Sequence, residues 1–187
     1  MNDTIRLAFL VKHNSLRSVL ALGAAPNGNT GKYTRPATNM STLVYDCDLE
    51  EAAYERAKLC ESYTPESPDT LKENSFNYTH RARTFEQAAK LSTQSWWAEL
   101  KNSEGLEQIQ NIFYTHLGLN RFAKIGSDLT TKVGCGIYNC TSIVNIVCRY
   151  ETTLANAKKL YAAGPNCNKC KATCANGLCP AVATGDL

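Results

Sequence analysis

Apolar positions near the start of the chain recur at the spacing of a helix. Across residues 4–22 they fall three or four positions apart, and Gly23 follows as a stop. Residues 24–39 are rich in Gly, Asn, Thr and Pro and show no period, which is typical of a loop. The first part of the chain is therefore predicted to be one amphipathic helix followed by a long loop.

Two further segments have the same helical spacing. One covers residues 48–60, where Asp48 is followed three residues later by a glutamate in an acidic variant of the capping box. The other covers residues 84–105, where Thr84 and Gln87 form a capping box at its start. The stretch between them, residues 62–69, contains two prolines and is predicted to be irregular.

The pattern changes from helix to strand late in the chain. Residues 133–138 and 142–150 are predicted to be strands joined by a short turn. Adjacent apolar pairs in the second strand break simple alternation, so this strand should be covered on both faces. The fold class is therefore α+β: a three-layer α-β-α sandwich around a small, mostly antiparallel sheet. The predicted division is a domain over residues 1–152 and a cystine-rich tail over residues 153–187.

Composition narrows the class of protein further. The 187 residues are 43% hydrophobic and 20% charged, with a net charge of +3, which is typical of a globular protein. This small charge excludes a strongly polycationic nucleic-acid binder. No run approaches the roughly 18 apolar residues of a membrane span. The early apolar stretch ends at Lys12, so no signal peptide is visible.

Nine cysteines favour an oxidising compartment and a secreted, extracellular protein. A zinc site of four thiolates in the tail is the alternative, but it leaves five cysteines unexplained. The sequons at Asn39 and Asn77 also suit a secreted glycoprotein. Because the count is odd, one cysteine is either unpaired or paired outside this chain segment. The nine are Cys47, Cys60, Cys135, Cys140, Cys148, Cys167, Cys170, Cys174 and Cys179.

Several segments, in the same order along the chain, resemble the CAP family of cysteine-rich secretory, antigen 5 and pathogenesis-related proteins. The overall pattern is most similar to the venom allergen-like, or activation-associated, secreted proteins of parasitic nematodes. The resemblance implies the CAP fold with a hinge-like tail. It is carried by residues 9–18, 43–60, Glu73-Asn74, 95–100, 132–136, 147–150 and Leu160-Tyr161.

The resemblance also bears on the odd cysteine. Relatives often carry a further cysteine just before the first helix, where this chain begins at Met1. We therefore expect the native protein to extend upstream and to supply a tenth cysteine. An intermolecular disulfide, giving a homodimer, is the alternative.

The family cleft usually holds two histidines and two acidic residues, whose imidazoles bind a divalent metal. By their positions, Glu73 and Glu99 match the two acids. Thr64 and Arg121 occupy the regions where the histidines are expected. Because a guanidinium stays protonated, Arg121 cannot coordinate metal and is expected to pair with one of the acids. The prediction is a degenerate cleft without cofactor or metal, with His116 as a weak candidate for a displaced ligand.

The resemblance implies binding rather than catalysis. We expect a secreted, non-enzymatic protein that acts at a host–parasite interface, through a host protein partner or through a sterol or fatty acid in an apolar groove between helices. A metal-dependent hydrolase that uses the cleft is one alternative. A structural, self-associating protein is another. No Gly-x-Ser-x-Gly, His-Glu-x-x-His or phosphate-binding loop is present to favour other enzymes.

Overall fold

The computed structural model describes residues 1–61, 72–79 and 84–182. Thr64 and the stretch predicted to be irregular, residues 62–69, lie outside this part of the chain. In chain order the elements are α1 (Asp3–Ala21), β1 (Val44–Tyr45), α2 (Cys47–Lys58), β2 (Glu73–Tyr78), α3 (Phe85–Lys101), the short 3-10 helix η2 (Thr115–Leu117), α4 (Asn120–Gly126), β3 (Thr130–Asn139) and β4 (Val144–Thr152).

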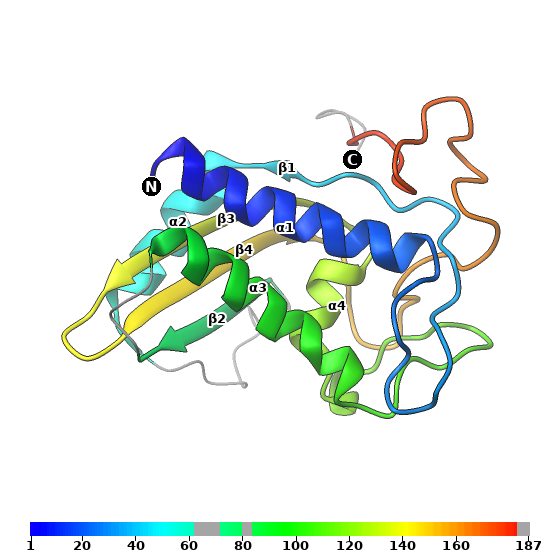
Figure 1. The fold of residues 1–187 in the computed structure, drawn as a ribbon, viewed down its shortest axis with the longest axis horizontal. Coiled ribbons are helices and arrows are strands. Elements are labelled where there is room, and N and C mark those ends of the chain that lie inside the picture. The colour runs from blue at the N-terminus through cyan, green and yellow to red at the C-terminus, as the bar shows by residue number, and fades with distance from the viewer. Residues whose placement is uncertain (62–71, 80–83, 183–187) are drawn as a thin grey trace.

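A four-stranded sheet forms the middle layer (Figure 1). Its strand order is β1-β3-β4-β2, with β1 parallel to β3 and the other pairs antiparallel. Helices α1, α3 and α4 pack together over one face, and α2 packs against β3 and β4 on the other. The predicted three-layer sandwich with a small, mostly antiparallel sheet is confirmed.

The larger core lies between the sheet and the α1–α3–α4 layer. Its side chains come from all these elements, among them Phe9, Trp96, Phe122 and Ile146, each with 0% exposure. Trp96 also donates its indole N–H to the Ser75 carbonyl over 3.0 Å, which fixes α3 against β2. The core therefore holds together β2, α3 and α4, which carry Glu73, Glu99 and Arg121.

Some predicted boundaries were wrong. The cap of α2 is Asp46, not Asp48, because the Asp46 carboxylate accepts the amides of Asp48 and Leu49 over 3.0 and 2.9 Å. The third helix ends at Lys101, before the expected stop at Gly105. The two predicted strands are longer or shifted, at residues 130–139 and 144–152. At α3 the structure agrees with the predicted cap: Thr84 accepts the amide of Gln87.

Besides the short 3-10 helix η2, three elements of the described chain were not predicted. Strand β2 has the sequence ENSFNY, whose polar residues give no strand signal, yet it pairs with β4 along its whole length. Helix α4 has only seven residues, too few for a periodic stripe. Strand β1 has two. All three are set by long-range contacts rather than by local pattern.

Four disulfides join Cys60–Cys140, Cys135–Cys148, Cys167–Cys174 and Cys170–Cys179. The alternative of a zinc site in the tail is wrong, because all four tail thiols are in disulfides. Cys47, at the first position of α2, is free and exposed.

The tail lies against the body through backbone and side-chain bonds. The Cys179 amide donates to the Met40 carbonyl over 2.8 Å. The Asn166 amide nitrogen donates to the carbonyls of Ala21, Ala37 and Gly177. None of the helices in the described part of the chain has the length and apolar character needed to cross a bilayer.

Candidate functional site

Glu73 is the first residue of β2, at an edge strand of the sheet, and only 6% of its surface is exposed. Its two carboxylate oxygens contact two different guanidinium groups. Arg56 on α2 lies 3.5 Å from Oε1, and Arg149 on β4 lies 3.2 Å from Oε2. Arg149 is the cross-strand partner of Glu73 in the β2–β4 ladder, so the pairing follows from strand register. One buried carboxylate is thus neutralised by two cations.

Glu99 lies near the end of α3 and caps the start of α4. Its Oε2 accepts the amides of Arg121 and Phe122 over 2.7 and 3.0 Å. Helix α4 has no side-chain cap of its own, and a carboxylate at a helix N-terminus satisfies orphan amides and the helix dipole. The Arg121 guanidinium lies 3.8 Å from Oε1. Burial raises the pKa of the Glu99 carboxyl, opposed by these amides and by the positive charges of Arg121 and Lys124.

Lys124 is a residue of this site that the sequence analysis missed. It lies one turn after Arg121 on α4, is 0% exposed, and donates its Nζ proton to the Asn120 carbonyl over 3.0 Å. Burial lowers the pKa of Lys124 to about 7, while Glu99 and Glu73 act in the opposite direction. The one signal in the sequence was a lysine three residues after Arg121, on the same side of a short helix.

A buried chain of hydrogen bonds links the cleft to α1. Asn74, next to Glu73, donates to the Arg121 carbonyl over 3.0 Å and to the Tyr150 hydroxyl over 3.1 Å. The Tyr150 oxygen lies 3.0 Å from Nε2 of His13, whose Nδ1 lies 2.8 Å from the Phe9 carbonyl. A carbonyl only accepts, so Nδ1 carries the proton and Tyr150 donates to Nε2. Burial lowers the pKa of His13 to about 4, which keeps the ring neutral.

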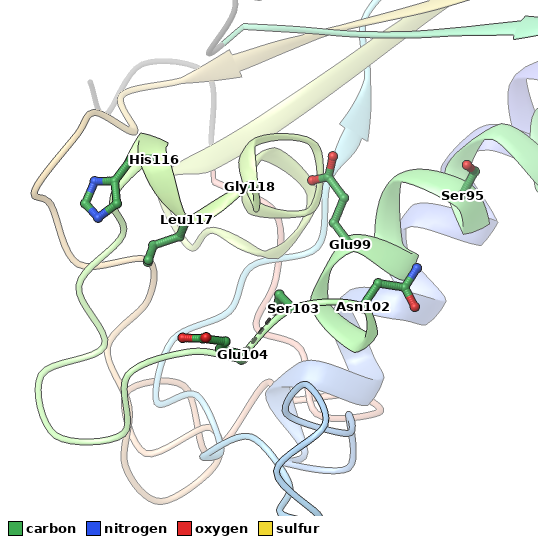
Figure 2. Close-up of a pocket in the computed structure, with 9 residues that line it drawn as sticks. Ser95, Glu99, Asn102, Ser103, Glu104, His116, Leu117 and Gly118 are labelled. Atoms are coloured by element: carbon green, nitrogen blue, oxygen red, sulfur yellow. Dashed lines mark hydrogen bonds between the residues drawn. The ribbon is translucent and has the colours of Figure 1, made fainter.

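Glu99 also lines an open pocket with a volume of about 480 Å³ (Figure 2). Figure 2 places His116 and Glu99 on opposite sides of this pocket, with the imidazole turned away from the carboxylate. Among the described residues, the one group of three possible metal ligands with atoms within 4.8 Å of one another consists of disulfide cysteines. His116 therefore belongs to no preformed set of ligands there. The pocket is lined by Ser95, Glu99, Asn102, Ser103, Glu104, Gly105, His116, Leu117 and Gly118.

The structure thus brings three of the four predicted cleft residues into one region. Glu99 and Arg121 are in direct contact. Glu73 is linked to them through Asn74 and through its effect on Lys124. Of the two sequons, Asn39 is exposed on a loop, whereas Asn77 is half-buried in β2.

Comparison with known proteins agrees with the fold and the cysteines. The model of the "CAP: Cysteine-rich secretory protein family" matches residues 10–150, which is most of the chain. The chain belongs to the CAP family. This confirms the resemblance found in the sequence.

Two of its relatives are proteins of Ancylostoma caninum. Over 97% of its length, the CAP chain is 31% identical to Ancylostoma secreted protein of Ancylostoma caninum, and it spans 45% of that protein. It is 28% identical to hookworm platelet inhibitor 1 of the same organism, covering 91% of this chain and 75% of that protein. The crystal structure of NaASP2 with Zn2+ matches with a TM-score of 0.84 and 32% identity over 96% of both chains. BmVAL-1 matches with a TM-score of 0.84 and 25% identity over 98% of this chain and 97% of that one.

These likenesses support a CAP-domain protein of the nematode secreted type. Multiple disulfides and relatives named as secreted proteins are consistent with an extracellular protein. The chain spans less than half of the first relative, so the activity of that whole protein is not carried over.

Proposed function

We propose that this CAP protein is a secreted, non-enzymatic binding protein that acts on host molecules, and that its cleft is a degenerate metal site. One observation supports this most directly: all four carboxylate oxygens of Glu73 and Glu99 already have cationic or amide partners. A metal ligand or a general base needs a carboxylate oxygen that is open to the metal or the substrate. Here each such oxygen must first leave a guanidinium or a helix cap.

The alternative is a metal-dependent hydrolase, which needs an activated water together with a metal or base. The structure of the relative NaASP2 was determined with Zn2+, so zinc is the appropriate probe. In this chain His116 is the candidate for a displaced ligand, across the pocket from Glu99.

Zinc calorimetry at neutral pH separates the two proposals. We expect only heats of dilution for the wild type, Glu73→Gln and Glu99→Gln. Glu104→Gln is a matched control, because it removes one carboxylate of the same pocket that caps no helix. Stoichiometric binding that is lost in Glu99→Gln or His116→Ala, but kept in Glu104→Gln, would contradict the degenerate cleft. Glu99-dependent turnover of a peptide panel would establish the hydrolase.

For the ligand we propose a fatty acid in a groove between α1 and α3. The groove has a volume of about 350 Å³ and exposes Leu7 and Val11 of α1 by 56% and 62%. Lys12 and Lys90 line its edge together with Glu86, which forms an ion pair with Lys90 over 3.6 Å. Lys12 thus gives the groove a positive charge for a carboxylate, next to the apolar side chains an acyl chain would cover.

Displacement of a fluorescent fatty acid by palmitate tests this groove. Val11→Asp should weaken binding by roughly tenfold or more, because it puts a charge where apolar surface is buried. Val19→Asp is the control, since Val19 is 38% exposed on the same helix and does not line the groove. Equal effects of the two variants, or no saturable binding of palmitate or of a sterol, would remove the lipid proposal and leave a host protein as the ligand. Sedimentation of the unliganded protein tests the self-associating alternative.

A further inference from the structure

The two arginines on Glu73 do more than neutralise it. Each points its Nε edge at a different oxygen of the same buried carboxylate, so both guanidinium groups are held in fixed places. A guanidinium has five N–H donors in a planar fork, and one ion pair through Nε leaves the terminal Nη donors for other acceptors.

These terminal donors reach solvent. The side chains of Arg149 and Arg56 are 33% and 23% exposed. Within residues 1–61, 72–79 and 84–182, neither Nη atom of Arg149 donates a hydrogen bond, and its ion pair with Glu73 is formed through Nε. Arg56 uses Nη1 on Glu61, an acid whose own side chain is 65% exposed. The Arg149 fork is therefore both positioned and unoccupied.

The attraction for an anion comes from the fixed guanidinium groups rather than from net charge. Arg56 and Arg149 are balanced by Glu73 and by the exposed Glu61. The Lys72 carbonyl accepts the amide of Tyr150, which continues the β2–β4 pairing one residue before Glu73 and holds the Glu73–Arg149 pair in register. Partly desolvated cations that are already fixed lose little side-chain entropy when they bind an oxyanion.

We propose that Arg149, with Arg56 beside it, forms a binding site for a sulfate or phosphate group at the β2 edge of the sheet. Such a tetrahedral oxyanion accepts two parallel N–H bonds from one guanidinium fork. The group is either a free ion or an ester on a glycan. This site is separate from the lipid groove, and a metal bound to Glu73 would have to displace Arg56 or Arg149 from it.

Calorimetry with inorganic sulfate, inorganic phosphate and a heparin-derived hexasaccharide tests the site. Arg149→Gln should weaken binding of the probe that the wild type binds by roughly tenfold or more, because it removes a charge-assisted pair of bonds. Arg149→Lys keeps the charge and loses the fork, so it should recover only part of the affinity. Binding of the hexasaccharide alone indicates a glycan ester, and binding of the simple ions as well indicates a site for the free group.

Lys101→Gln is the matched control. It removes one positive charge from the exposed end of α3, far along the chain from the site. Equal losses in Arg149→Gln and Lys101→Gln would show general electrostatic attraction and overturn the proposal, as would the absence of binding to all three probes. Far-ultraviolet circular dichroism and thermal unfolding of each variant establish that it is folded. If Arg149→Gln is not folded, Arg149→Lys and Arg56→Gln carry the test.

Discussion

Lys124 is a buried base whose charge is costly to the fold. Its pKa is about 7 in the folded protein against 10.5 for the free side chain, so between these pH values the unfolded chain binds the extra proton. Stability should therefore rise as the pH rises from 7 to 10. The penalty, fully present below pH 7, is on the order of 3–5 kcal/mol.

Lys124→Met removes this penalty while it keeps an unbranched side chain. We expect the free energy of unfolding at pH 7 to increase by roughly 1–3 kcal/mol, less than the full penalty because Glu99 and Glu73 lose a neighbouring cation. Urea unfolding of the wild type and of Lys124→Met from pH 6 to 10 measures this change. The difference in the free energy of unfolding between the two proteins should decrease as the pH rises. A constant gap would mean that Lys124 remains protonated throughout.

His13 should make the protein sensitive to acid. The pKa of His13 is about 4 in the folded protein and 6.5 in the unfolded chain. Between these pH values the unfolded chain is protonated at His13 while the folded protein is not. The contribution of the neutral His13 ring to the free energy of unfolding is fully present above pH 6.5. As the pH falls to 4, the free energy of unfolding decreases by roughly 2–3 kcal/mol. Urea unfolding across this range and the NMR titration of the His13 ring measure the effect. A His13 midpoint above pH 6 would contradict the assigned neutral ring.

At the residue scale, the resemblance to the CAP family singled out Glu73, Glu99 and Arg121, and the expectation that Arg121 lies by one of the acids matches its 3.8 Å approach to Glu99. It did not find Lys124 or Arg149. Their importance comes from burial and from cross-strand register, which a linear pattern does not contain. Thr64 lies outside the described residues, so its place in the cleft stays a prediction.

At the scale of elements, α2 approaches β3 through two glycines. A methyl group added to Gly134 would collide with the backbone of α2 at Asp46, Leu49 and Glu50, and one added to Gly136 with the backbone at Ala53 and Tyr54. Such backbone atoms cannot turn aside as a side chain can. The whole helix would have to move.

Gly136→Ala is therefore expected to lower the free energy of unfolding by roughly 2–4 kcal/mol, as overpacking of a tight interface does. Thermal or urea unfolding measures the change. Gly31→Asn is the control, because Gly31 has open space around it and asparagine tolerates its φ of 69°. Similar losses in both variants would show that close packing of α2 is not the cause.

The elements that were predicted are those whose own sequence specifies them. α1, α2 and α3 have apolar stripes with capping residues, and β4 contains the β-branched residues Val144, Ile146 and Val147. Strand β2 and helix α4 depend on partners far along the chain: the ladder with β4 for one, and the carboxylate of Glu99 for the other. Local sequence propensity therefore does not predict β2 or α4.

At the scale of the whole molecule, the disulfides differ in access. Cys135 and Cys148 are both 0% exposed inside the main core, whereas Cys170 and Cys174 of the tail are half-buried. Thiol–disulfide exchange needs a thiolate to reach a sulfur atom. Cys60 and Cys140 are both half-buried as well. Mild reduction of the native protein should therefore open Cys60–Cys140 and the tail bonds before Cys135–Cys148.

Timed alkylation with mass spectrometry of the peptides measures this order. Free Cys47 is labelled at time zero and serves as the internal reference. Early labelling of Cys135 would show that the core opens as readily as the tail. The division into a domain of residues 1–152 and a tail of residues 153–187 would gain support if the tail loosens while the far-ultraviolet spectrum is unchanged.

The position of Glu99 also restricts how the cleft can change in evolution. Arg121→His would restore an imidazole, but the carboxylate would remain bonded to the first amides of α4. Turning it toward a metal would leave those amides without a cap, in a helix that has no other side-chain cap. Intermediates on the way back to a metal site would thus have a weakened fold and no metal yet bound. If the cleft is degenerate, as we propose, its metal site is therefore easier to lose than to restore.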